Sequence, residues 1–84
     1  MTTKLRSTKR WLEKMELQPE LITLNYPEGK REGLRVDTDY EGPYPNSDVF
    51  QIHSMTRNHI AKRYGKSLTV ESRGYYTAMF IIEQ

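Results

Sequence analysis

With 84 residues and a mass of 10.0 kDa, the chain has room for one small domain with a modest core. It contains no cysteine, which excludes disulfides, thiolate metal sites and cysteine nucleophiles. The net charge is only +2, and no apolar run approaches the roughly 18 residues that a membrane span needs, so we expect a cytoplasmic protein without membrane contact.

The first predicted element is a helix over residues 5–17. Apolar and small side chains recur there at steps of three and four, which is the spacing of one helix face. Pro19 ends the element, because the residue before a proline avoids helical backbone angles. Trp11 lies beside the apolar face and is expected to join the core. The positions with this spacing are Leu5, Thr8, Leu12 and Met15.

Residues 21–40 change to a period of two, which is typical of strands with one buried face. Between two alternating runs, Pro27–Lys30 places proline and glycine where they favour a turn. We therefore predict a hairpin over residues 21–40. Its alternating apolar positions are Ile22, Leu24, Tyr26, Leu34, Val36, Thr38 and Tyr40.

A second helix is predicted over residues 48–64. Ser47 can accept a hydrogen bond from the free N–H groups of its first turn, and Asp48 places negative charge at the positive end of the helix dipole. Gly65 follows at the place where a left-handed residue commonly ends a helix. An alternative keeps Val49–Ile52 extended and starts the helix later. One face gathers Val49, His53, Thr56, Ile60 and Tyr64.

The last residues predict a second hairpin over residues 67–83, turning at Arg73–Gly74, where glycine supplies conformational freedom. Its final strand, residues 75–82, is apolar on both faces, so we expect it to be covered. The element order is αββαββ. It predicts an α+β fold with one antiparallel sheet, two helices packed on one face, and a single domain over residues 1–84.

The two imidazoles, His53 and His59, do not indicate a metal site. Six positions apart on a helix, they point about 240° from each other, and no carboxylate stands at a spacing that completes a ligand set. We expect a hydrogen-bonded core position for His53 and a solvent-facing one for His59. No metal, cofactor or catalytic residue is predicted. A small ribonuclease stays open as an alternative, because His59, Arg63 and Tyr64 lie within one turn.

The segment Arg57–Ser67 resembles the first half of a helix-turn-helix DNA-binding element. Ala61 and Gly65 stand where that family has a small residue and the glycine of its turn. The resemblance then ends, because Lys66 occupies a usually apolar position and Leu68–Val70 favours a strand over a recognition helix. A helix that ends in glycine explains the same residues, and no family is identified.

The distribution of charge is the strongest functional signal. Residues 1–15 carry a net charge of +4, residues 16–48 carry −5, and residues 49–84 carry +3. Aromatic residues are interleaved with the cations of both basic segments, which suits the phosphates and bases of a nucleic acid. We therefore predict a non-catalytic nucleic-acid-binding protein, provided that folding brings the basic segments together. The residues expected to contact nucleic acid are Arg6, Lys9, Arg10, Arg57, Lys62, Arg63, Lys66 and Arg73.

A protein-binding accessory or inhibitor protein is the main alternative, and the small net charge fits it well. Such a protein would use the acidic hairpin or an uncovered face of the last strand. A homodimer is another way of covering that face. The residues on the face in question are Tyr75, Thr77, Met79 and Ile81.

Overall fold

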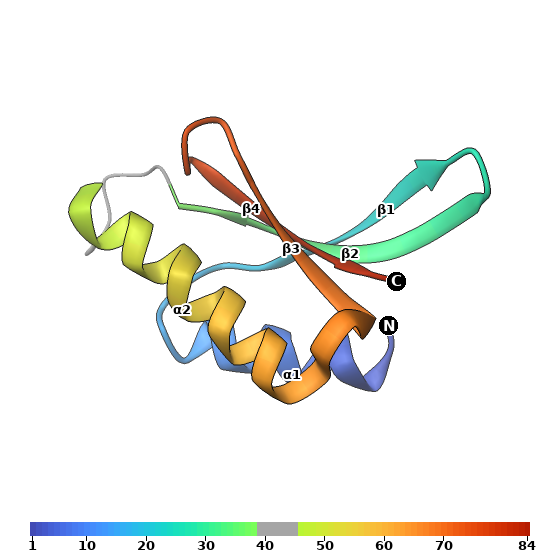
Figure 1. Ribbon diagram of the computed structural model, residues 1–84, viewed down its shortest axis with the longest axis horizontal. Coiled ribbons are helices and arrows are strands. Elements are labelled where there is room, and N and C mark those ends of the chain that lie inside the picture. The colour runs from blue at the N-terminus through green and yellow to red at the C-terminus, as the bar shows by residue number, and fades with distance from the viewer. Residues whose placement is uncertain (39–45) are drawn as a thin grey trace.

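The computed structural model describes residues 1–38 and 46–84, and the side chains of residues 1–38 and 49–84. Two helices lie on one side of a four-stranded antiparallel sheet (Figure 1). This arrangement confirms the predicted α+β class and the αββαββ order. The elements are α1 (Thr3–Glu13), β1 (Glu20–Tyr26), β2 (Gly29–Asp37), α2 (Asn46–Tyr64), β3 (Leu68–Arg73) and β4 (Ala78–Glu83), with a 3-10 turn at Gly65–Ser67.

The first helix ends before the predicted residue 17, because the chain must turn back toward the sheet. At its start, the Thr2 side chain accepts a hydrogen bond from the amide of Leu5 at 3.3 Å, which is a capping contact. At its end, Glu16 takes a left-handed conformation with φ 64°, and the Leu17 amide donates to the carbonyl of Leu12. This reversal carries Leu17 into the core, where it is 3% exposed.

The second helix includes Val49–Ile52, so the alternative with an extended start is wrong. It begins at Asn46, before the predicted residue 48, so Ser47 lies within its first turn and not before it. What the side chains of Ser47 and Asp48 contribute stays a prediction, because both lie outside the described part of the chain. Residues 39–40 of the predicted hairpin also lie outside it.

The final strand begins at Ala78 and not at residue 75, because the turn before it is longer than Arg73–Gly74. Gly74, Tyr75 and Tyr76 all have positive φ, between 54° and 68°. The amide of Thr77 closes the turn by donating to the carbonyl of Arg73 at 3.1 Å. A left-handed backbone costs a tyrosine about 1 kcal/mol, so this turn holds two strained residues in succession.

The sheet has the strand order β1-β2-β4-β3, which places β4 at its centre. In register, Ile81 of β4 lies between Leu34 of β2 and Val70 of β3. Met79 and Ile81 point toward the helices and are fully buried. The core therefore lies between the helices and this face of the sheet, and it comprises Leu5, Leu12, Leu17, Leu34, Val36, Ile52, Ile60, Leu68, Met79 and Ile81.

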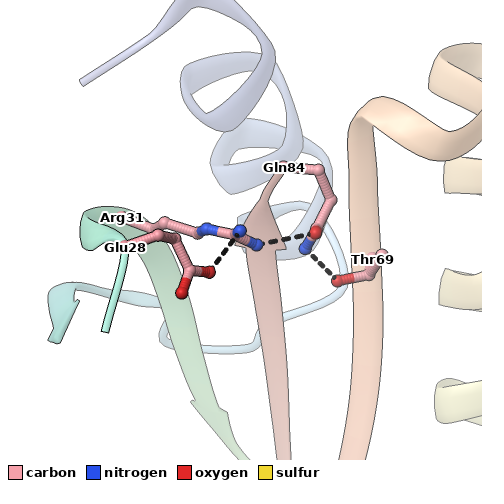
Figure 2. Close-up of polar contacts among 4 residues, drawn as sticks. All are labelled: Glu28, Arg31, Thr69 and Gln84. Atoms are coloured by element: carbon pink, nitrogen blue, oxygen red, sulfur yellow. Dashed lines mark hydrogen bonds and ion pairs between the residues drawn. The ribbon is translucent and has the colours of Figure 1, made fainter. Parts of the chain in front are cut away.

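The opposite face of the sheet has no helix from the described residues over it, and paired arginines cover it instead. Figure 2 shows Arg31 between Glu28, at 2.8 Å, and Gln84, at 2.7 Å, while the Gln84 amide donates to Thr69 on β3 at 2.8 Å. Beneath this layer, Ile82 is only 1% exposed. Long side chains with apolar stems can cover an apolar residue in this way while their charged heads stay hydrated.

Replacing Gly33 by alanine is expected to destabilise the sheet by about 1–3 kcal/mol. A Cβ atom at this position would lie 2.8 Å from the backbone oxygen of Ile81 in the neighbouring strand, so strand β2 or β4 would have to shift. Urea unfolding followed by circular dichroism would measure the loss. An unchanged midpoint would show that the strands accommodate the added Cβ atom without loss of stability, which would contradict the prediction.

Candidate functional site

A shallow groove between α1 and α2 brings the two basic segments of the sequence together. Its volume is about 210 Å³. Three of its residues come from α1, one is Lys14 at the C-terminal cap of α1, and three come from the last turns of α2. Four of the seven are cationic or titratable near neutral pH. We call it the α1/α2 groove, and its lining residues are Ser7, Arg10, Trp11, Lys14, His59, Arg63 and Tyr64.

The helical repeat explains why these side chains share one surface. Ser7, Trp11 and Lys14 stand at steps of four and three along α1, which puts them on one stripe beside the buried face. His59 and Arg63 are four residues apart on α2 and therefore lie one turn from each other. Packing of the two helices against the same sheet then brings these two stripes side by side.

The aromatic centre of the groove is a stacked pair, Trp11 on His59. The ring centroids lie 4.0 Å apart and the ring planes differ by 5°. Both side chains are half-buried, and Trp11 also packs against the core, as its place beside the apolar stripe predicts. The prediction that His59 faces solvent is wrong, because the indole of α1 covers one face of its ring.

The groove is positively charged and has no carboxylate among its lining residues in the described part of the chain. Arg10, Lys14 and Arg63 form no ion pair with any carboxylate whose side chain the structure describes. Burial, and then the charge of Arg63, lower the pKa of His59, which favours its neutral form. In the described part of the chain, no carboxylate therefore competes with an external anion for these cations.

The sheet face without helices is charged in a different way, because its arginines already have acidic partners. Arg31 pairs with Glu28 at 2.8 Å, and Arg35 pairs with Asp37 at 3.0 Å. Arg73 was expected among the nucleic-acid contacts, but it lies on this face, 2.6 Å from Glu71 and over the ring of Phe80. It therefore does not share a surface with the α1/α2 groove.

The other cations named from the sequence fall into three groups. Arg10 and Arg63 line the groove. Arg6, Lys62 and Lys66 are exposed on the helices or on the turn after α2, outside the groove lining. Lys9 pairs with Glu13 at 3.6 Å, and Arg57 donates to Ser72 at 2.6 Å. The predicted site left out five residues that line the groove: Ser7, Trp11, Lys14, His59 and Tyr64. Lys14 stands three residues after Trp11 and four after Arg10, a spacing that could have indicated Lys14 and Trp11.

The strand face proposed for a protein partner is the face that the helices cover. Met79 and Ile81 are fully buried in the core, so neither offers a contact to another chain. Thr77 is half-buried in the turn before β4, whereas Tyr75 is fully exposed. The helices cover this face of β4, as expected from the sequence. The face is therefore not accessible to a partner protein.

His53 occupies the core position expected for it, and it is the middle member of a chain of hydrogen bonds. The Thr38 hydroxyl donates to the carbonyl of Tyr76 at 2.7 Å, so it accepts from Nε2 of His53 at 3.0 Å. Nδ1 is then the acceptor for the Ser72 hydroxyl at 2.7 Å, which in turn accepts from Arg57 at 2.6 Å. In a neutral imidazole one ring nitrogen donates and the other accepts, which gives this order of donors.

Burial, and then the nearby Arg57 charge, lower the pKa of His53, and the Tyr76 backbone opposes them only in part. Both ring nitrogens are occupied inside the core. His53 is therefore unsuited to an acid or base role. The three residues on which the ribonuclease alternative depends, His59, Arg63 and Tyr64, instead line the α1/α2 groove together, and that alternative stays a prediction. The described residues also contain no group of three metal-ligating side chains.

The helix-turn-helix resemblance does not extend into the structure. After α2 and the 3-10 turn, the chain continues as strand β3 and not as a recognition helix.

In the described residues, no helix combines the length and the apolar character needed to cross a lipid bilayer. Comparisons with protein families, with curated proteins and with solved structures find no match to this chain.

Proposed function

We propose that this protein binds single-stranded nucleic acid through the α1/α2 groove and performs no catalysis on it. The observation that supports this function best is that Arg10 and Lys14 from the first basic segment meet Arg63 from the last one. They do so beside the stacked rings of Trp11 and His59.

Each part of the groove matches a part of the ligand. Free cations bind phosphates and release their counterions, and aromatic rings stack on bases without regard to sequence. The stripe from Ser7 to Lys14 is about 10 Å long at 1.5 Å per residue, so the groove suits a few nucleotides only. A single strand fits better than a duplex, because the faces of its bases are free to stack.

The test uses Trp11, the single tryptophan of the chain, as its reporter. Titration with oligouridine should change the Trp11 fluorescence and give a micromolar dissociation constant at low salt. Three groove cations predict that log K falls against log salt with a slope of about −2. A duplex of the same length should bind more weakly. Absence of any binding at low salt would rule the function out.

A protein partner is the second candidate function, and exposed aromatic side chains at the other end of α2 favour it. Tyr75 is 100% exposed and Phe50 is 55% exposed, while Phe50 and Tyr76 meet edge to face with centroids 5.2 Å apart. Exposed rings of this kind are enriched in protein interfaces. Sedimentation of the wild type and of Phe50→Ser would test the homodimer form of this candidate. A dimer that the variant loses would favour it.

A further inference from the structure

His59 lies where its proton and a bound anion would affect each other. From α1 and its C-terminal cap, its neighbours in the groove are Ser7, Arg10, Lys14 and the indole of Trp11. From its own helix, Arg63 and Tyr64 line the same groove. Every charged group among these is a cation.

This neighbourhood disfavours a proton on the free protein. The imidazole is half-buried against Trp11, and a fourth positive charge beside Arg63 would be repelled, which is why the pKa of His59 lies below its ordinary value. A phosphate placed between the cations would favour the protonated form of His59. It would supply the missing negative charge, and an imidazolium stacked on an indole would also gain a cation–π contact.

We propose that a nucleic-acid phosphate bound in the α1/α2 groove is taken up together with one proton, which His59 receives from solvent. His59 then acts as a fourth cation of the site. This inference rests on the proposed function, because it concerns the same groove, and it adds that pH regulates binding.

The size of the effect follows from linkage. An opposite charge at about 4–6 Å raises a pKa by roughly 1–3 units, and each unit corresponds to a tenfold change in affinity. Because coupling is reciprocal, the proton raises the affinity for the phosphate by the same factor by which the bound phosphate raises the affinity of His59 for the proton. Binding should therefore strengthen about tenfold as the pH falls from about 8 to about 6.

The experiment measures oligouridine binding by Trp11 fluorescence across this range, with His59→Phe as the matched variant. Uracil and the phosphodiester do not change charge over this pH range, so the ligand contributes no proton of its own. Phenylalanine keeps a ring stacked on Trp11 but cannot titrate. Because His53 is present in both proteins, its titration affects them equally, and circular dichroism at each pH shows that both stay folded.

Three outcomes separate the inference from the proposed function. Binding of the wild type that strengthens about tenfold toward acid, with the same affinity of His59→Phe at both ends of the range, supports the proton-linked site. Equal pH dependence in the two proteins overturns it while the nucleic-acid function stands. No oligouridine binding to the wild type at any pH overturns both. A pKa of His59 measured by NMR should rise when oligouridine is added, and an unchanged value would contradict the proposal independently.

Discussion

Replacing Arg10, Lys14 and Arg63 together by alanine is expected to weaken oligouridine binding on the order of a hundredfold at about 50 mM salt. The three side chains line one groove and have no acidic partner among the described side chains, so their charge is available to phosphates. The loss of three contacts should also flatten the salt dependence, changing the slope by about 2. Titration of the variant at several salt concentrations measures both effects.

The matched control removes the same total charge from other surfaces, in the triple variant Lys30→Ala, Arg35→Ala and Arg73→Ala. Arg35 and Arg73 belong to the sheet face where carboxylates already neutralise them, so this variant should keep its affinity within a few fold. If the two triple variants lose affinity equally, net charge alone explains the binding, and the α1/α2 groove is not a site. Thermal unfolding of each variant checks that the fold is intact.

Replacing His53 by alanine is expected to cost about 2–4 kcal/mol of folding stability, which is a large share of what a domain of this size has. The change leaves a cavity and removes the group that links Thr38 to Ser72 across the core. The Ser72 hydroxyl would lose the acceptor of its proton, and an unmatched donor adds to the loss. Urea unfolding at pH 7 measures the difference, with Ser54→Ala, an exposed neighbour on α2, as the control expected within about 0.5 kcal/mol.

The same variant should also change how stability depends on pH. The folded pKa of His53 is lowered, so between the ordinary value near 6.5 and the folded value the unfolded chain binds a proton that the folded chain does not. Wild-type stability should therefore fall as the pH is lowered from 7 through this window. His53→Ala should lose less stability over the same range, and His59 is the group with a lowered pKa that remains in the described part of the chain. An equally steep fall in both proteins would mean that His53 is not the acid-sensitive group.

Much of the fold followed from sequence because its patterns are local. The alternation of Leu34 and Val36 with charged residues predicts a strand, and these two side chains are buried beneath the helices. The turn before β4 was misplaced because two tyrosines hold left-handed conformations that their type disfavours, and the geometry of the turn overrides that preference. The conformation of this turn depends on contacts with residues distant in sequence. The Thr38 hydroxyl, for example, donates a hydrogen bond to the Tyr76 carbonyl.

The candidate site was only partly predictable for the same reason. Arg10 and Arg63 were among the cations predicted to bind nucleic acid, and the structure places both in the α1/α2 groove. Nothing local indicates that Trp11 stacks on His59, because helix packing brings those rings together. Arg73, named with Arg10 and Arg63, lies instead on the sheet face without helices. Its partner Glu71 stands two residues before it on the same face of a strand, a spacing that could have predicted the ion pair.

The central place of β4 determines how the chain can fold. The hairpin of β1 with β2 and the hairpin of β3 with β4 can each form from neighbouring residues, but the sheet is continuous only after Leu34 pairs with Ile81. That pairing closes a long loop containing α2. The chain loses the conformational entropy of this loop before most of the core is buried. We therefore expect closure of the β2–β4 ladder to set the folding rate, with α1 and α2 consolidating on the sheet afterwards.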